Sequence, residues 1–165
     1  MDEDTGAADV AHDVLGRLDY PMLIVTGASQ GEQVGCLVGF WTQCTMDPPR
    51  LLVCLSKNNR TYRVAGSSPT LAVHVLSERH HDLAVLFGGE TNDEVDKFAQ
   101  VPWRPGRDDL PILDGPSWLV GRVTERVDFG DHVGFALAIL EGEDRGGRGQ
   151  VGFQSVKDLD PGHEA

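Results

Sequence analysis

Short runs of strand-forming residues, each ended by turn residues, constrain the fold of this chain more than any other feature of its sequence. The runs that we interpret as strands are residues 20–26, 33–44, 51–55, 70–76, 118–128 and 133–140, with 150–154 as a candidate for a last strand. Glycine, proline and aspartate between these runs predict turns at residues 27–31, 47–49 and 129–132. Strands mostly joined by hairpins predict a mainly β protein whose antiparallel sheet closes into a barrel.

Short helices are predicted around and between these strands. Apolar residues recur at helical spacing within residues 7–18, which predicts an amphipathic helix before the first strand. Asn58 or Asn59 is placed to cap a helix that ends near residue 65, and Ser77 to cap a second helix that ends at Gly88 and Gly89. We expect the buried side of this second helix to consist of His81, Leu83, Ala84, Leu86 and Phe87. A weaker helix is predicted at 93–99, an ordered loop at 102–116 and a mobile loop at 141–149.

The 165 residues correspond to one domain, because a domain typically holds about 100–200 residues. We expect an N-terminal helical leader at residues 1–19 and the barrel at residues 20–142. Residues 143–165 are then a flexible loop and the C-terminal segment of the same domain.

Acidic residues outnumber basic ones, with 26 aspartates and glutamates against 14 lysines and arginines and a net charge of −12. This charge repels nucleic-acid phosphates and anionic lipid surfaces, so neither is an expected partner. No apolar run reaches the roughly 18–20 residues of a membrane span, and the first residues are acidic where a secretory signal is basic. We therefore expect a cytoplasmic protein that does not bind membranes.

Several common site motifs are missing from the sequence. Cys36, Cys44 and Cys54 lie in apolar runs without metal-binding spacing, so we expect reduced packing residues and no metal site. The glycines at positions 27, 31 and 35 match neither a dinucleotide-binding fingerprint nor a phosphate loop. No Gly-x-Ser-x-Gly motif supports a covalent hydrolase.

The best candidate for an anion site is the junction between the strand at 51–55 and the helix after it. Unpaired N–H groups of a helix start, hydroxyls, amides and two cations come together there. The residues that supply these groups are Ser56, Lys57, Asn58, Arg60 and Thr61. This junction suits a phosphate. The alternative is that an asparagine only caps the helix and that both cations are solvated.

A set of segments, in order along residues 20–142, resembles the flavin reductase family. The set is Gly35, Asp47-Pro48-Pro49-Arg50, the runs at 51–57 and 71–76, residues 83–87, Lys97-Phe98, residues 111–115, and Gly130-Asp131-His132. The set is specific, although each piece alone is weak. The resemblance implies a homodimeric, FMN-binding split β-barrel, antiparallel and Greek-key-like, with short inserted helices. It also implies hydride transfer from NADH or NADPH to FMN, or to FAD as second choice, in some members to supply a monooxygenase partner.

The resemblance further implies which residues meet the nucleotides. The backbone of residues 39–42 would lie along the polar edge of the flavin ring, and the junction residues would hold its phosphate. His132 would lie beside the nicotinamide in a catalytic role. Apart from the phosphate junction, the positions that match cofactor-binding positions of the family are Gly39, Phe40, Trp41, Thr42, His74, Phe87 and Lys97. Taken alone, these residues also allow core packing for the aromatics, a structural role for His74, a surface turn for His132 and a surface charge for Lys97.

The chain departs from the family pattern at four positions where relatives carry Thr, Asn or Ser. It has Leu37, Gly39, Phe40 and Gln43 there, so backbone contacts to a flavin survive and hydroxyl contacts do not. A flavin reductase is our first hypothesis. A flavin-binding carrier or accessory module without turnover, a deazaflavin-dependent reductase, and a barrel for another planar ligand are the alternatives. The expected seam of the homodimer is Phe40, Trp41, Leu86 and Phe87.

Overall fold

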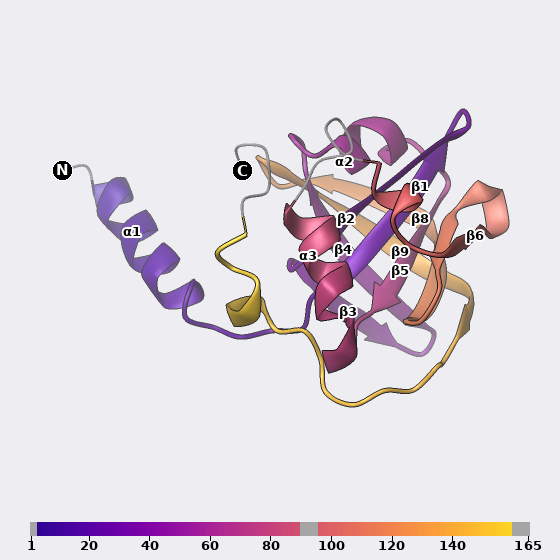
Figure 1. Ribbon diagram of the computed structural model, residues 1–165. Coiled ribbons are helices and arrows are strands. Elements are labelled where there is room, and N and C mark those ends of the chain that lie inside the picture. Colours follow the sequence, from indigo (N-terminus) through magenta and orange to yellow (C-terminus); the bar gives the residue numbers. More distant parts are fainter. Residues whose placement is uncertain (1–2, 90–95, 160–165) are drawn as a thin grey trace.

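The computed structural model describes residues 3–89 and 96–159 of the chain (Figure 1). Its main element is a seven-stranded antiparallel sheet with the order β2-β1-β5-β8-β9-β4-β3. The strands are β1 (Leu23–Ser29), β2 (Glu32–Val38), β3 (Trp41–Met46), β4 (Pro49–Ser56), β5 (Thr70–Val75), β8 (Ser117–Asp128) and β9 (His132–Glu143). A separate hairpin pairs β6 (Trp103–Pro105) with β7 (Pro111–Leu113).

The helices are short. The first begins and ends earlier than the predicted range 7–18, and the other two α-helices overlap the ranges predicted for them. The helices are α1 (Glu3–Leu15), α2 (Arg60–Ala65) and α3 (His81–Gly89), with 3-10 turns at Glu78–His80, Lys97–Ala99, Arg107–Asp109 and Phe153–Ser155. Asn59 caps α2, because its side chain accepts a hydrogen bond from the Thr61 N–H. The predicted turns between β3 and β4 and between β8 and β9 are confirmed. The division of the chain at residues 19/20 and 142/143 stays a prediction.

The sheet closes into a barrel where β2 is followed by β3. These strands stand at opposite ends of the strand order, yet only Gly39 and Phe40 separate them in the chain. The sheet therefore curves until its two edges meet. At the meeting point the Cys54 N–H of β4 donates to the Phe40 carbonyl oxygen at 2.8 Å. The expected mainly β barrel is thus confirmed.

Two apolar clusters lie on opposite faces of β1. The barrel interior contains Leu23, Val25, Val34, Cys36, Val53, Leu55, Leu71, Val73, Phe135 and Leu137. The second cluster contains Met22, Ile24, Phe87, Phe98, Leu113, Val151 and Val156. Side chains of a strand alternate between its faces, so α3 and the C-terminal segment cover the face of β1 that the barrel does not.

The turn between β1 and β2 is tighter than the sequence indicates. It consists of Gln30 and Gly31, whose φ angles of 50° and 79° are typical of a two-residue hairpin. β1 therefore continues through Gly27, where a Cβ atom would lie 2.4 Å from the Cβ atom of Ala65 in α2. Gly27 serves helix packing rather than the turn, and the expected turn at 27–31 is corrected to residues 30–31.

Other predicted boundaries were wrong for tertiary reasons. The expected strand at residues 33–44 is two strands, because the chain crosses from one sheet edge to the other within it. The ordered loop at 102–116 contains the β6–β7 hairpin, and the candidate last strand at 150–154 is replaced by a 3-10 turn. His81 is exposed rather than on the buried side of α3. Of the helix predicted at 93–99, residues 93–95 lie outside the described residues, and Lys97–Ala99 is a 3-10 turn.

His74 of β5 is a fully buried core residue that joins three strands. Its Nε2 accepts the Leu113 N–H of β7 at 3.0 Å, so its Nδ1 carries the proton and donates to the Ile24 carbonyl oxygen of β1 at 3.2 Å. Burial lowers the pKa of His74 to about 4. Both ring nitrogens are used by the backbone, so the structural interpretation of His74 replaces its assignment as a cofactor-binding residue.

We predict that the free energy of unfolding falls as the pH is lowered from about 6.5 to about 4. The unfolded chain binds a proton at His74 in this range, and the folded chain does not, so protonation favours unfolding. The depressed pKa corresponds to a loss of up to about 3 kcal/mol. Burial also lowers the pKa of His80, which adds to the loss.

Denaturant unfolding at several pH values measures this slope. The His74→Asn variant should show a shallower slope than the natural protein. An unchanged slope in His74→Asn would contradict the assignment.

Candidate functional site

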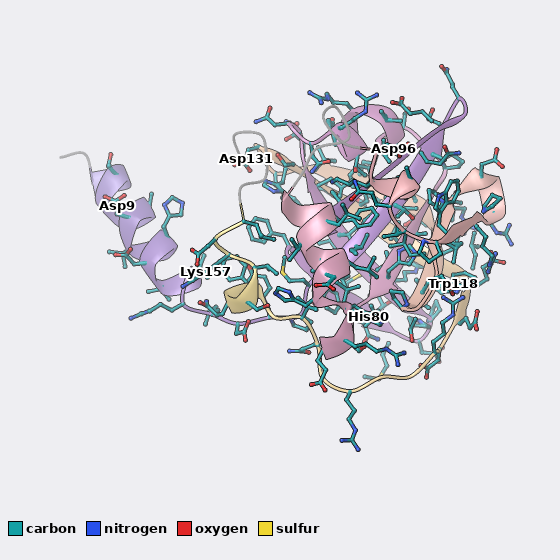
Figure 2. The ribbon with its side chains drawn as sticks, in the orientation of Figure 1. Asp9, His80, Asp96, Trp118, Asp131 and Lys157 are labelled. Carbon is teal, nitrogen blue, oxygen red and sulfur yellow. The ribbon has the colours of Figure 1, made fainter. Side chains whose placement is uncertain are left out.

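Four of the residues singled out from the sequence meet at one end of the barrel. Ser56, the last residue of β4, is the register partner of His132, the first residue of β9. The Lys57 N–H donates to the Asp131 carbonyl oxygen at 2.9 Å. The Phe40 ring lies 5.1 Å from the His132 ring, tilted by 52°. Asp131, labelled in Figure 2, marks this end of the barrel, on the opposite side from Trp118.

Lys57 is held by a carboxylate of the β8–β9 turn. Its Nζ donates to both oxygens of Asp128, each at 2.9 Å. This contact, with a further hydrogen bond from the Gly130 N–H, lowers the pKa of Asp128. The side chains of Lys57 and Asp128 are 37% and 68% exposed. Exposed ion pairs contribute little to stability, so a stronger anion can take the place of Asp128.

His132 has a carboxylate beside it. Its Nδ1 lies 2.7 Å from Asp131 Oδ1, and this hydrogen bond lowers the pKa of Asp131. A neutral imidazole that donates through Nδ1 keeps a lone pair on Nε2. The ring is therefore oriented by Asp131 on one side and contacts Phe40 on its surface. This arrangement suits a residue that positions a ligand or holds a proton.

The other residues of the predicted phosphate junction do not all lie beside Lys57. The Asn58 N–H donates to Ser56 Oγ at 3.3 Å, so this turn stays close to Lys57. Arg60 instead forms an ion pair with Glu32, at the start of β2. Thr61 is 1% exposed. Ser56, Lys57 and Asn58 lie together, whereas Arg60 faces Glu32 and Thr61 is buried, so the assignment of Arg60 and Thr61 to the phosphate site stays a prediction.

The crossing segment lines a hollow of about 620 Å³ beside Phe40. Its lining is mostly apolar and aromatic and consists of Leu15, Leu18, Tyr20, Pro21, Gly39, Phe40, Trp41, Thr42 and Gln43. The volume lies within the roughly 300–1,000 Å³ typical of small-molecule sites. The indole N–H of Trp41 donates to the Pro21 carbonyl oxygen at 2.7 Å, which fixes that wall. The strand predicted to hold a ring thus borders a space of suitable size and polarity.

Gly39 is required by its neighbours inside this wall. A Cβ atom at this position would lie 2.8 Å from Cε2 of Tyr20 and 3.1 Å from the sulfur of Met22. Phe40, in contrast, is 56% exposed. Of these two residues, Phe40 is the one whose side chain is available to a ligand.

Two further predicted residues lie in the core instead. Phe87 is 2% exposed and packs edge-to-face on Phe98. Lys97 is 3% exposed, and its Nζ donates to the carbonyl oxygens of Phe87 at 3.1 Å and Gly35 at 3.5 Å. Lys97 is thus neither the surface charge that its residue type suggests nor part of the cluster around His132. Phe87 is unavailable as a ligand contact or as part of a dimer seam.

The cysteines differ from one another. Cys36 is buried, and burial raises the pKa of its thiol, as expected for a packing residue. Cys54 is partly exposed and Cys44 is exposed, so the expectation of packing was wrong for Cys44. Within residues 3–89 and 96–159, no three histidine, cysteine or acidic side chains are grouped as metal ligands would be. None of the described helices has the length and apolar character needed to cross a bilayer.

Sequence reasoning missed Asp128, Asp131, Leu15 and Leu18 as parts of this region. The two aspartates flank the β8–β9 turn, and the hairpin prediction alone places them near the His132 ring. The two leucines belong to the N-terminal segment, and no local pattern indicates that they contact residues 39–43.

Comparison with known proteins gives a consistent family. The family model described as "Flavin reductase like domain" matches residues 15–154. The "Probable flavin reductase" of Rhizobium meliloti is 35% identical over 123 residues, which are 73% of this chain and 39% of that protein. The "FMN reductase (NADH) RutF" of Cronobacter sakazakii is 36% identical over 103 residues, 62% of this chain and 61% of that protein. The chain therefore spans less than two thirds of the length of both relatives.

A solved structure has the same fold. The "nitrilotriacetate monooxygenase component B" homologue of Mycobacterium thermoresistibile superimposes with a TM-score of 0.74 at 27% identity. The match covers 86% of this chain and 78% of that one.

Proposed function

The chain belongs to the flavin reductase-like domain family, and we propose that it is a flavin reductase that transfers a hydride from NADH or NADPH to FMN, with FAD as second choice. One observation carries this proposal: a series of contacts links the phosphate-binding candidates, through His132 and Phe40, to the apolar hollow. Lys57 contacts Asp131, His132 is oriented by Asp131, and Phe40 joins His132 to the hollow. A nucleotide with a phosphate at one end and a flat ring at the other fits such an arrangement.

The walls of the hollow fit the flavin ring through their shape and backbone. Phe40 and Trp41 supply aromatic surface, and β3 is the last strand in the sheet order. Three of the four departures from the family pattern have structural roles here. Leu37 packs toward α3, Gly39 leaves room for Tyr20 and Met22, and the Gln43 amide donates to the Thr45 carbonyl oxygen. We propose that backbone groups of residues 39–42 meet the polar edge of the ring.

The phosphate is assigned to Lys57 and Ser56, with the Asn58 turn beside them. A charge-assisted hydrogen bond from an ammonium to a phosphate is among the stronger polar contacts in proteins. Asp128 has to give up Lys57 when the phosphate arrives. A bound phosphate therefore lies close to the negative charges of Asp128 and Asp131 as well as to the positive charge of Lys57.

A bound flavin supplies the hydride-accepting chemistry, and the protein contributes binding, orientation and exclusion of water. Phe40 provides a surface for the ring, while the hydrogen bond of Trp41 to Pro21 keeps the neighbouring wall in place. His132, oriented by Asp131 through Nδ1, positions the nicotinamide donor and offers the lone pair of Nε2 as a hydrogen-bond acceptor. Hydride transfer depends mainly on holding the reactants roughly 3–3.5 Å apart, so we propose a moderate effect of His132 on the rate.

The names of the relatives support the rest of the proposal. An FMN reductase that uses NADH and a monooxygenase component are both similar to this chain. We propose that the protein delivers reduced flavin to a monooxygenase partner in the cytoplasm.

A flavin-binding accessory module without turnover is the second candidate function. The observation in its favour is that Leu37, Gly39, Phe40 and Gln43 replace the polar side chains of the family pattern. A deazaflavin-dependent reductase would have the same departures.

We expect the purified protein to oxidise NADH or NADPH faster than free flavin does when FMN or FAD is added. Absorbance at the nicotinamide band, with each donor and flavin in turn, measures this. Flavin that stays bound through gel filtration without oxidation of either donor would favour the accessory module. No binding of either flavin would contradict both functions.

Lys57→Ala should weaken FMN binding roughly 10- to 150-fold, because a hydrogen bond to a charged group contributes about 1.5–3 kcal/mol. Riboflavin has the ring without the phosphate, so its affinity should be nearly unchanged. Titration of flavin fluorescence measures both affinities. The exposed Lys157→Ala is the matched control and should bind FMN normally. Equal losses for FMN and riboflavin would contradict the assignment of the phosphate to Lys57.

We propose a homodimer that uses the outer face of β4 and β9 as its seam, because Phe87 is unavailable. Val133, Phe135 and Leu137 point into the barrel, so the alternate residues of β9 point outward. This outward face is made of Leu52, Phe129, Gly134, Ala136 and Ala138. Phe129 lies over Gly134 and is 59% exposed.

We expect a mass in solution of about twice the 17.9 kDa of one chain. Ala136→Arg should give the monomer mass, because it places a charge in the seam. Val85→Arg, on the exposed side of α3, should leave the dimer intact. Light scattering after gel filtration distinguishes these results, and a monomeric natural protein with flavin bound would contradict the dimer.

A further inference from the structure

The N-terminal segment reaches the hollow, although most of α1 extends away from the barrel (Figure 1). Leu15 and Leu18 line the hollow opposite the β3 side chains. They are 58% and 50% exposed, and together with Pro21 and Phe40 they make much of the lining apolar. Val10 and Val14, which precede Leu15 in α1, are also exposed but do not line the hollow.

The segment is fastened at its base by the C-terminal part of the chain. The Gln154 side-chain amide donates to the carbonyl oxygens of Gly16 at 2.9 Å and Leu18 at 2.8 Å. The Gln154 N–H donates to Asp19 Oδ1 at 3.0 Å. Next to this contact, the rings of Tyr20 and Phe153 stack with centroids 4.9 Å apart. Leu15 and Leu18 are therefore held at the edge of the hollow even though α1 projects beyond it.

We propose that Leu15 and Leu18 are the outer wall of the flavin site, and that Gln154 is the residue that positions this wall. The inference rests on the proposed function. The β3 side of the hollow offers backbone groups and aromatic surface to a ring, and the leucines face it from the other side. A flat ring bound between them covers both leucines and removes their apolar surface from water.

Such a wall acts on the ring alone and not on the phosphate. Its contribution comes from apolar surface removed from water, and it also limits access of water and solutes to the ring. Riboflavin is therefore the appropriate probe, since its affinity is independent of Lys57. Two readouts other than activity report on the wall: the dissociation constant of riboflavin, and quenching of the fluorescence of the bound ring by iodide.

We expect the double variant Leu15→Ser/Leu18→Ser to raise the riboflavin dissociation constant roughly 10-fold and to increase iodide quenching of the bound ring. Val10→Ser/Val14→Ser is the matched control on the same helix and should change the dissociation constant by less than twofold. Gln154→Ala should act in the same direction as the leucine variants, with a roughly threefold effect, because it releases the segment without removing apolar surface. Leu18→Met, which keeps an apolar side chain, should retain natural affinity.

The outcomes separate this inference from the proposed function. If the natural protein binds neither FMN nor riboflavin, the proposed function and the wall both fail. If it binds riboflavin, and the leucine variants leave the affinity and the quenching unchanged, only the wall is overturned. Equal effects of the valine and leucine pairs would also overturn it, because they would assign the loss to α1 in general. Thermal unfolding of each variant checks that the barrel is intact.

Discussion

The barrel and the candidate site both depend on the two-residue connection, Gly39 and Phe40, between β2 and β3. The chain leaves β2 at Val38 and enters β3 at Trp41, at the other end of the strand order, so the sheet has to curve until its edges meet. The hydrogen bond from the Cys54 N–H fixes the Phe40 carbonyl oxygen at this point, and the side chains of Tyr20 and Met22 fill the space that a side chain on Gly39 would need. The Phe40 side chain then lies outside, beside His132. Closure of the barrel therefore brings Phe40 and the hollow to the place where the end of β4 already lies beside the β8–β9 turn.

Much of the fold could be predicted from the sequence, because strand-forming runs and turn residues are local signals. Asn59 as a cap and the turn between β8 and β9 needed nothing more than the nearest residues. The errors occur where contacts with a distant segment of the chain determine the local structure. Gly27 looks like a turn residue, but it is a glycine because Ala65 lies against it. Residues 33–44 were predicted as one strand, and the meeting of the sheet edges divides this stretch at Gly39 and Phe40.

The candidate site was predictable in part for the same reason. Ser56 and Lys57 follow a strand end, and His132 follows a turn, so each could be noticed alone. Their proximity, and the carboxylates beside them, follow from the register of β4 with β9. Burial decided the residues that failed: His74, Phe87 and Lys97 have functional groups that a sequence comparison can align, but the protein uses them inside. Nothing near Leu15 or Leu18 in the sequence indicates the contact with residues 39–43.

The hydrogen bonds between Gln154 and residues 16–19 also bear on the order in which parts of the protein fold during synthesis. The residues that fasten the N-terminal segment are separated from it by 135 to 138 positions. The barrel strands up to Glu143 emerge from the ribosome before Gln154 does, whereas the hydrogen bonds to Gly16 and Leu18 have to wait for Gln154. The strands of the scaffold thus emerge first and the fastening of the N-terminal segment comes last, so a ligand that needs the fastened segment meets its complete site only after residue 154 has emerged.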